Sequence, residues 1–484
     1  MQPNPQALEP DQADAAEFGR GLLDKQRAAF MGRGPANAEE RVDRLHTLAR
    51  AIGRYRDEII EAVVADFGHR SMHETLLSEV VGALGEIRHT ASQVKSWMKP
   101  RRVPRTLETL TARGRIHFQP KGVVGIMGAW NYPAFLCFSP MTGALAAGNH
   151  VLVKPSDVTP RTAEVVAHLV GEHFDPSCVA VVTGDRETSQ AFSNLPFDHL
   201  LYTGGTEVGR HVMQAAAKNL VPVTLEMGGK SPTVIGPGAN LARAIDSILM
   251  GKLINAGQTC IAPDYVLLPG SRVEEFRLLF EQAVRQRYPQ MTGNPDVTWI
   301  VNDRHHARIQ TLLEDARSKG AKVEPILADG EEIPTGVRVV PPTLVTGVRD
   351  DMRIAQEEIF GPILPLIPYE NIDQAIEHVN ARPRPLALYL FESDRRLIER
   401  VVNETTSGGA CVNDTMLHIS HHHLPFGGIG PSGLGAYHGH RGFLEFSHQK
   451  GVLYQGAISP ARWLRPPYGS RLSDILNRVV SRMS

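Results

Sequence analysis

Three side chains in this sequence have the types needed for covalent chemistry on a carbonyl group: a thiol, a carboxylate and a carboxamide. Cys260 ends the stretch Asn-Ala-Gly-Gln-Thr-Cys, Glu226 precedes Met-Gly-Gly, and Asn131 lies in Trp-Asn-Tyr-Pro. A thiolate adds to a carbonyl carbon, and an amide N–H stabilises the oxyanion that forms. A carboxylate activates the water that releases the product. This set of groups predicts oxidation of an aldehyde through a thioester, provided that a hydride acceptor is also bound.

Each of these residues also has a simpler interpretation. Most free cysteines are small buried hydrophobes, although Gly257 permits close backbone approach and the Gln-Thr before Cys260 is too polar for a plain core strand. Glu226 could be a solvated or ion-paired carboxylate at a strand end. Asn131, before Tyr-Pro, could be a turn residue. The residues alone leave these alternatives open.

Short apolar runs alternate with helical patterns from Gly122 onward, which predicts βαβ units and parallel, doubly wound sheets. Strands are expected at residues 123–127, 150–153, 179–182, 200–202, 221–225, 265–268 and 337–340. Helices are expected at residues 134–147, 160–173, 208–219, 240–254, 274–286 and 303–319. The pattern therefore predicts an α/β fold with two Rossmann-like lobes that meet near residues 227–229.

The two ends of the chain are expected to be less regular. Residues 1–16 are predicted to be a disordered lead, followed by helical patterns over 42–63, ending at Gly68, and over 74–97. Residues 100–105 are expected to be a linker and 106–118 a two-stranded ribbon. Apolar residues recur at helical spacing near the C-terminus: Leu472, Ile475, Leu476, Val479, Val480 and Met483. We expect this helix to pack on the body or on a partner subunit, with a membrane-surface helix or a cap over the substrate tunnel as alternatives.

Composition excludes several classes of function. The chain has 484 residues, a net charge of −1, and 42% apolar and 21% charged residues, which is ordinary for a globular protein without a nucleic-acid-binding face. Its four cysteines are widely spaced, so neither a disulfide framework nor a structural zinc site is expected. No signal peptide or membrane-spanning run is found, and a cytoplasmic location is predicted. The cluster of His418, His421, His422 and His423 is not expected to bind a metal, because consecutive residues of an extended segment point to alternate faces.

Together, the motifs resemble those of the aldehyde dehydrogenase superfamily over roughly residues 35–450. The matching segments are 130–133, 154–157, 202–209, 225–229, 257–260, 357–362 and 424–430. The segment 433–439 looks most like the class-3 branch, which includes fatty, aromatic and coniferyl aldehyde dehydrogenases.

The resemblance implies roles for particular residues. It implies that Cys260 is the nucleophile, Glu226 the base that activates water, and Asn131 a donor to the oxyanion together with the Cys260 backbone N–H. It also implies binding of NAD, with NADP as an alternative because Asp157 stands where the family more often has Glu. The implied cofactor-binding residues are Trp130, Lys154, Asp157, Gly204, Gly205, Thr206, Gly209, Glu358 and Phe360.

The resemblance also implies an organisation. Residues 1–102 and 120–227 are expected to form the NAD(P)-binding domain, 228–430 the catalytic domain, 103–119 and 431–458 the oligomerisation segments, and 459–484 a tail helix. A homodimer is implied, as is a hydrophobic aliphatic or aromatic aldehyde substrate. Two alternatives are an acylating enzyme that uses CoA or phosphate, which the presence of Glu226 disfavours, and a non-catalytic binding protein.

Overall fold

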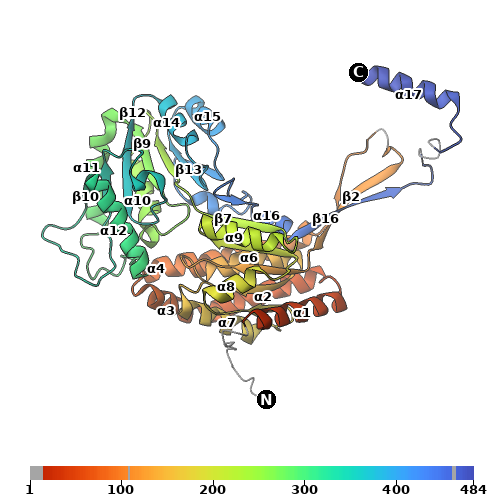
Figure 1. Cartoon of the computed structure of the whole chain (residues 1–484), viewed down its shortest axis with the longest axis horizontal. Coiled ribbons are helices and arrows are strands. Elements are labelled where there is room, and N and C mark those ends of the chain that lie inside the picture. The colour runs from red at the N-terminus through yellow and green to blue at the C-terminus, as the bar shows by residue number, and fades with distance from the viewer. Residues whose placement is uncertain (1–14, 107–108, 460–464) are drawn as a thin grey trace, which may run out of the picture.

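The computed structural model describes residues 15–106, 109–459 and 465–484, and its strands form three sheets (Figure 1). Two sheets are mainly parallel and are flanked by helices, and the third is antiparallel. This arrangement confirms the predicted α/β class with two doubly wound units and a small β element. None of the helices in the described part of the chain has both the length and the hydropathy needed to span a membrane.

The first sheet has six strands in the order β15-β7-β6-β3-β4-β5. They are β3 (Val123–Met127), β4 (His150–Lys154), β5 (Val179–Val181), β6 (His199–Gly204), β7 (Val223–Met227) and β15 (Gly433–Leu434). All pairs among β3 to β7 are parallel, as predicted, and β15 is antiparallel to β7. The side chains of β3 and β4 are buried throughout, which a parallel sheet requires when helices cover both faces.

Helices cover this sheet on both sides because successive residues of a strand point to opposite faces. Val124 and Ile126 pack with α2, α3, α5, α6 and α7, whereas Val123 and Leu152 pack with α1, α8 and α9. The helices are α1 (Ala15–Arg33), α2 (Ala38–Arg54), α3 (Arg56–Phe67), α5 (Gly82–Trp97), α6 (Phe135–Ala147), α7 (Pro160–His173), α8 (Arg186–Ser193) and α9 (Thr206–Ala217).

The second sheet has seven strands in the order β10-β11-β12-β9-β8-β13-β14. They are β8 (Pro232–Ile235), β9 (Tyr265–Pro269), β10 (Lys322–Pro325), β11 (Thr343–Thr346), β12 (Ile363–Tyr369), β13 (Ala387–Phe391) and β14 (Gly409–Val412). Its helices are α10 (Leu241–Leu253), α11 (Val273–Arg287), α12 (Asp303–Ser318), α13 (Arg353–Gln356), α14 (Ile372–Asn380) and α15 (Arg395–Glu404). The chain passes from the first sheet to the second between Met227 and Pro232.

The strand predicted at residues 337–340 is wrong. Val339 and Val340 are buried, but this segment has no regular strand pairing, and its Arg338 carbonyl accepts a hydrogen bond from the Ile300 backbone N–H at 3.0 Å. The strand of this region, β11, begins at Thr343, after two prolines. The valines of this irregular segment are buried, and their composition therefore led to the wrong prediction of a strand.

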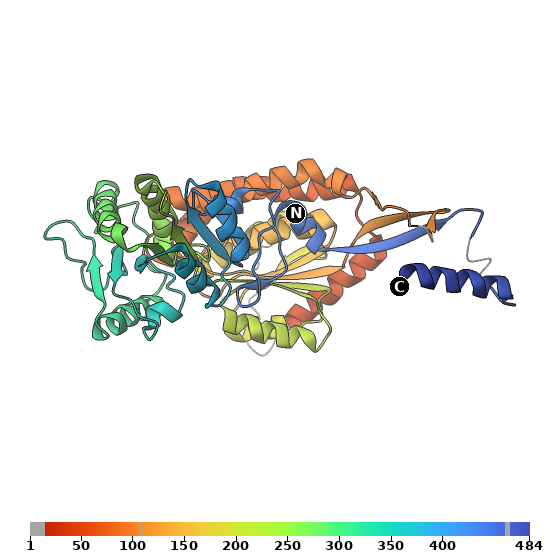
Figure 2. The same ribbon diagram turned by 90° about the horizontal axis from the view of Figure 1, so that it is seen from above.

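The third sheet contains β1 (Arg101–Arg102), β2 (Ala112–Pro120) and β16 (Ser447–Gln455). The ribbon predicted within residues 106–118 is corrected, because β2 pairs antiparallel with the distant β16, from Ser447↔Pro120 to Gln455↔Ala112. Part of the expected linker is the short strand β1, which pairs with the other edge of β2. Together β2 and β16 form an arm that projects from the body (Figures 1 and 2).

Helix α17 (Ser470–Met483) confirms the helical pattern near the C-terminus, but the expected packing on the body is absent. Its apolar side chains Ile475, Leu476, Val479 and Val480 are all exposed. The helix lies beyond the end of the arm, far from the two large sheets (Figures 1 and 2). In this position it does not cap a cavity of its own chain.

The N-terminal region is more helical than expected. Residues 1–14 of the predicted disordered lead lie outside the described part of the chain, and α1 begins at Ala15. The helix predicted over 74–97 is a continuous rod formed by α4 (Met72–Thr75), the π-helical turn η1 (Leu76–Val81) and α5. Turns of this kind are frequent at functional sites, and this one lines the cavity described next.

Candidate active site

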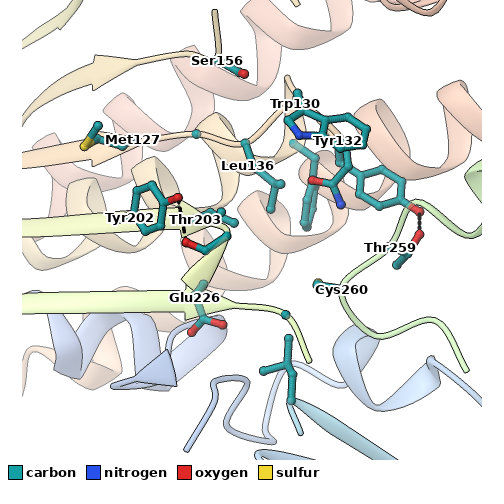
Figure 3. A pocket seen from close by; sticks show the side chains of 18 of the residues that line it. Met127, Trp130, Tyr132, Leu136, Ser156, Tyr202, Thr203, Glu226, Thr259 and Cys260 are labelled. Carbon is teal, nitrogen blue, oxygen red and sulfur yellow. Dashed lines mark hydrogen bonds between the residues drawn. The ribbon is translucent and has the colours of Figure 1, made fainter. Parts of the chain in front are cut away.

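A cavity of about 1550 Å³ contains the three residues predicted to carry the chemistry. Asn131 follows β3, Glu226 lies in β7, and Cys260 lies in a loop after α10. Figure 3 shows Glu226 on its strand and Cys260 in its loop, below Trp130 and Tyr132, around the same pocket. Residues from both large sheets therefore meet at one cavity, at the carboxyl ends of the strands of the first sheet, where α/β sheets bind ligands.

The loop that carries Cys260 begins with a tight backbone turn. Asn255, Ala256 and Gly257 are consecutive residues with positive φ angles of 53°, 52° and 73°. A Cβ on Gly257 would lie 2.5 Å from the carbonyl oxygen of Gly361, so only glycine fits there. This conformation stores strain that the surrounding contacts must hold.

Gln258 supplies several of those contacts. Its Nε2 donates to the carbonyl oxygens of Asn255 at 2.9 Å and Trp299 at 3.0 Å, and its Oε1 accepts from the Val301 backbone N–H at 3.0 Å. Gln258, two residues before Cys260, therefore holds the loop in place through backbone contacts. Cys260 itself is half-buried and lines the cavity.

The Cys260 thiol is held in its protonated form. Burial, followed by the nearby carboxyl groups of Glu358 and Glu226, raises the pKa of Cys260 to about 12. The thiolate is the nucleophilic form, so reaction requires loss of this proton or a positive charge close to the sulfur. A thiol with two carboxyl groups nearby is therefore suited to react only when a bound group brings positive charge close to the sulfur.

Asn131 is joined directly to the cysteine loop. Its side-chain Nδ2 donates to the backbone carbonyl oxygen of Gln258 at 3.1 Å. Its backbone carbonyl oxygen accepts from Asn255 Nδ2 at 2.9 Å. Tyr132 and Thr259 add a second link, with 2.6 Å between their hydroxyl oxygens. These bonds fix the Asn131 amide next to Cys260, and the second N–H of its amide is left for a ligand.

The buried ion pair of Arg70 and Glu79, which the sequence did not reveal, contacts the backbone of Asn131. Arg70 donates to the Asn131 carbonyl oxygen at 3.1 Å and to Glu79 Oε1 at 3.1 Å. Glu79 Oε2 in turn accepts the backbone N–H groups of Ala134 at 3.1 Å and Phe135 at 2.8 Å, at the start of α6. The pair therefore positions both the loop and the helix that follows it. Arg70 lies in the irregular connection between α3 and α4, where no sequence pattern indicated a buried partner.

Glu226 has the environment expected of a proton acceptor. Its side chain is buried and lines the cavity, and neither carboxyl oxygen has a hydrogen-bond partner among the residues that the structure describes. Burial, and then the charge of Glu445, raises the pKa of Glu226 well above its ordinary value. An unpaired buried carboxyl group is costly for folding, which is a mark of a functional group rather than a structural one.

A polar chain lies behind Glu226 on the same strand. Thr224 Oγ1 donates to Glu445 Oε1 at 2.6 Å and lies 2.7 Å from His199 Nε2, while His199 Nδ1 lies 2.9 Å from Lys121 Nζ. Burial lowers the pKa of His199 to about 3, so its imidazole is neutral. No sequence pattern indicated these contacts, because the four residues come from separate segments.

The predicted dinucleotide-binding residues lie around another part of the cavity. Lys154, Asp157, Gly204 and Gly205 line it, and Gly205 is the N-cap of α9 without a side-chain hydrogen bond. A Cβ on Gly205 would meet open space, so the start of the helix is accessible from the cavity. A helix N-terminus that faces open space can bind a phosphate group, and the residues therefore fit a dinucleotide.

The Lys154 ammonium group forms two hydrogen bonds within the protein. Its buried Nζ donates to the carbonyl oxygens of Pro155 at 2.8 Å and Gly184 at 2.9 Å, which leaves one of its three N–H groups for a ligand.

Thr206 and Gly209 are not among the described residues that line the cavity. Thr206 Oγ1 donates to the Pro431 carbonyl oxygen at 3.2 Å, and Gly209 packs against Met227 and Tyr202.

Trp130, Glu358 and Phe360 form a further group in the cavity wall. The Trp130 and Phe360 rings are 5.4 Å apart at an edge-to-face angle, and Phe360 has a positive φ of 52°. The Glu358 carboxyl group lies against Gly228, where any side chain would collide with it. Burial and the charge of Asp264 raise the pKa of Glu358 to about 8.

The histidine cluster near residue 420 does not form a single site. His418 is buried against Phe426 and Tyr389, His422 lines the cavity and stacks on His89 with ring centroids 4.6 Å apart, and His423 is exposed. Within the described residues, no three histidine, cysteine or acidic side chains gather as metal ligands would.

The remaining wall of the cavity is mainly apolar. Exposed apolar side chains surround it, which is uncommon at a protein surface and marks a binding region for apolar groups. They are Leu77, Val81, Met250 and Leu417. Phe135, Ile419 and Phe426 add further apolar and aromatic surface.

Comparison with known proteins finds aldehyde dehydrogenases. The model of the aldehyde dehydrogenase family matches residues 9–452. A probable coniferyl aldehyde dehydrogenase of Pseudomonas aeruginosa is 47% identical over 461 residues, 95% of this chain and 96% of that protein. The substrate-bound structure of Staphylococcus aureus AldH is 37% identical, with a TM-score of 0.89 over 95% of this chain and 99% of that one. The NAD⁺ complex of an aldehyde dehydrogenase from Bacillus cereus is 26% identical, with a TM-score of 0.81 over 91% and 89% of the two chains.

Proposed function

Because this chain belongs to the aldehyde dehydrogenase family, and so oxidises an aldehyde to the acid with a nicotinamide dinucleotide, we propose that Cys260, Glu226 and Asn131 perform the reaction. The proposal rests on one observation: these three residues, from separate segments, meet in one cavity. The bond between Asn131 Nδ2 and the Gln258 carbonyl oxygen holds the amide beside the cysteine loop.

Each residue has one role in this mechanism. Cys260 Sγ loses its proton to solvent and adds to the carbonyl carbon, and the Asn131 amide and the Cys260 backbone N–H stabilise the oxyanion. A bound nicotinamide dinucleotide supplies the hydride acceptor. Loss of hydride from the tetrahedral adduct leaves a thioester on Cys260. Glu226 then removes a proton from water, which attacks the thioester, releases the carboxylic acid and restores the thiol.

We assign a hydrophobic substrate, with an aromatic aldehyde of the coniferyl type favoured. The apolar rim of Leu77, Val81 and Leu417 supports this assignment, because burial of apolar surface is the main attraction for such a ligand. The relative from P. aeruginosa, named as a probable coniferyl aldehyde dehydrogenase, supports the aromatic class.

NAD is the proposed cofactor. Asp157 lines the cavity near Lys154, and a carboxylate there disfavours a 2′-phosphate through like-charge repulsion. Arg186 lines the same region, and its positive charge favours NADP, so the ratio of the two activities is the relevant measurement.

We further propose a homodimer in the cytoplasm, with the domain divisions given by the family resemblance. The projecting arm of β2 and β16 and the exposed apolar stripe of α17 support an interface there. The four free cysteines support a reducing compartment. Sedimentation of the full chain and of a chain ending at residue 459 tests the dimer, which is wrong if the full chain is a monomer.

The activity is tested by NADH formation over short aliphatic, long aliphatic and aromatic aldehydes. Cys260→Ala should abolish turnover, while Cys411→Ala, another half-buried cysteine, should retain it. Peptide mass analysis after reaction with aldehyde and NAD should find the acyl group on Cys260. Turnover by Cys260→Ala, or formation of acyl-CoA in place of free acid when CoA is added, contradicts the proposal.

A further inference from the structure

Two glycines, Gly82 and Gly85, lie where α5 lines the cavity. Ser78, Gly82 and Glu86 are spaced by four residues along η1 and α5, so they lie on one helical face, with Gly85 beside them. A Cβ on Gly85 would have no atom of the described residues within 4 Å, and one on Gly82 would have its nearest neighbour in the Phe135 ring, at 3.4 Å. This face therefore leaves room for a bulky ligand against the helix.

A polar pair lies at the end of this face. Glu86 and His438 are both buried, at 3% and 4% exposure, and both line the cavity. Glu86 Oε2 accepts from Ser139 Oγ at 2.6 Å and lies 3.8 Å from His438 Nδ1. His438 Nε2 has no hydrogen-bond partner within the described residues. The reaction mechanism uses neither group, so their burial is unexplained by catalysis.

The backbone holds this pair with considerable strain. His438 has a positive φ of 79°, which is rare for a residue with a side chain. The next residue, Gly439, lies so close to the His422 carbonyl oxygen that no side chain could replace its hydrogen. Strain of this kind persists when the surrounding structure fixes it, and it is concentrated at functional sites.

The surroundings of the pair are aromatic. The His438 ring lies 5.1 Å from the Phe426 ring and 6.1 Å from the Phe135 ring, and both phenylalanines line the cavity. A flat ring bearing one polar group matches a wall that combines aromatic side chains, a helix face with two glycines and two buried polar atoms. An unbranched alkyl chain would leave His438 Nε2 without a hydrogen-bond partner among the described residues.

From this arrangement we propose that Glu86 and His438 bind a hydroxyl group on the aromatic ring of the substrate, so that the enzyme selects hydroxyaryl aldehydes. This inference rests on the proposed aromatic substrate class. The hydroxyl group donates to the carboxyl oxygen or to the free imidazole nitrogen, and the ring lies against Gly82 and Gly85. Etherification of the hydroxyl removes the donor and adds a methyl group that the pair cannot accommodate.

The protonation states agree with this geometry. Burial raises the pKa of Glu86 to about 7, with the bond from Ser139 opposing the shift. Burial lowers the pKa of His438 to about 3, so the imidazole is neutral and keeps one nitrogen as an acceptor. Both groups can therefore accept a hydrogen bond at neutral pH.

The test compares two substrates that differ by one methyl group: 4-hydroxy-3-methoxycinnamaldehyde and 3,4-dimethoxycinnamaldehyde. The wild-type enzyme should show a kcat/KM ratio of at least about tenfold in favour of the hydroxyl compound, the typical effect of one hydrogen bond to a buried acceptor. Glu86→Gln preserves the volume and can still accept from Ser139, and His438→Asn preserves a residue type that tolerates positive φ. Each variant should lower the ratio relative to the wild-type enzyme.

The ratio of the two kcat/KM values is measured on one sample of each variant, so partial loss of folded protein lowers both values equally and does not change the ratio. His423→Asn is the matched control, because His423 is exposed and is not among the cavity-lining residues, and it should keep the wild-type ratio. A wild-type ratio near one, or a ratio that persists in both variants, overturns the hydroxyl site while leaving the aldehyde chemistry intact. If hexanal is oxidised and neither cinnamaldehyde is, the proposed aromatic class fails, and the hydroxyl site fails with it.

Discussion

Arg70 Nη1 lies 3.1 Å from Glu79 Oε1, and both side chains are completely buried. Arg70 also donates to the Asn131 carbonyl oxygen, and Glu79 accepts two backbone N–H groups at the start of α6. The Arg70 guanidinium stacks over the rings of Phe67 and Tyr132, at 4.8 and 5.1 Å from their centroids. One ion pair thus connects the π-helical turn, the loop of the proposed oxyanion donor and the helix that follows.

Removal of one partner should therefore destabilise the protein strongly. Arg70→Met leaves the Glu79 charge buried without its cation, and we expect the free energy of unfolding to fall by about 3–5 kcal/mol. Urea denaturation followed by circular dichroism measures this change. Arg54→Met is the control, since Arg54 forms an exposed pair with Glu172, and such pairs contribute at most about 1 kcal/mol. Equal losses in the two variants would show that burial of the Arg70 pair is not the cause.

The Asn131 amide is predicted to act mainly in the transition state. Asn131→Ala removes one donor to the oxyanion, which should cost about 3 kcal/mol, or roughly a hundredfold in kcat, with little change in KM. Steady-state kinetics with a saturating cofactor measures both parameters. The variant also loses the bond to the Gln258 carbonyl oxygen, so its free energy of unfolding is measured in parallel. A rise in KM at constant kcat would assign Asn131 to substrate binding instead.

The proximity of Asn131 and Glu226 could be anticipated from the sequence for a physical reason. Asn131 follows β3 and Glu226 lies near the end of β7, and the ends of parallel strands meet at one edge of a sheet. Local apolar periodicity was sufficient to locate these strands. The placement of Cys260 depended on the family motif, because its loop is fixed by Gln258 contacts with distant backbone groups.

Features that depend on distant partners could not be predicted in the same way. The Arg70–Glu79 pair joins residues that local patterns assign to a turn and to a helix face. Strand β16 pairs with β2 across more than 300 residues, so the alternation within residues 106–118 suggested a local ribbon instead. The irregular segment at Val339 and Val340 shows the opposite error, since buried valines indicate a core but do not require a strand.

Cofactor selection should depend on the carboxylate of Asp157. Asp157→Ser removes the charge that repels a 2′-phosphate, so we expect the ratio of kcat/KM for NAD to that for NADP to fall by about tenfold or more, the effect of roughly 1.4 kcal/mol. Arg186→Ala is the matched variant, because it removes a positive charge from the same part of the cavity and should shift the ratio in the opposite direction. An unchanged ratio in Asp157→Ser would place the selecting group elsewhere.

Hydrolysis of the thioester should be limited by the protonation of Glu226. Because burial raises the pKa of this carboxyl group well above its ordinary value, the carboxylate that activates water becomes populated only as the pH rises. The steady-state rate should therefore increase with pH across the neutral range. Glu226→Gln should keep the first burst of NADH, since acylation of Cys260 does not need this base. Its steady-state rate should fall by about a hundredfold or more and lose that pH dependence.

The neighbouring Glu445 provides a sharper version of the same experiment. Its charge contributes to the raised pKa of Glu226, so Glu445→Gln should lower that pKa and move the rising limb of the rate toward lower pH, while the burst is unchanged. Rapid-mixing measurements of NADH from about pH 6 to 9 separate the burst, which reports the Cys260 thiol, from the steady state, which reports Glu226. Loss of the burst in Glu226→Gln would assign this carboxylate to the deprotonation of Cys260. A rising limb that stays in place in Glu445→Gln would show that burial alone sets the pKa of the base.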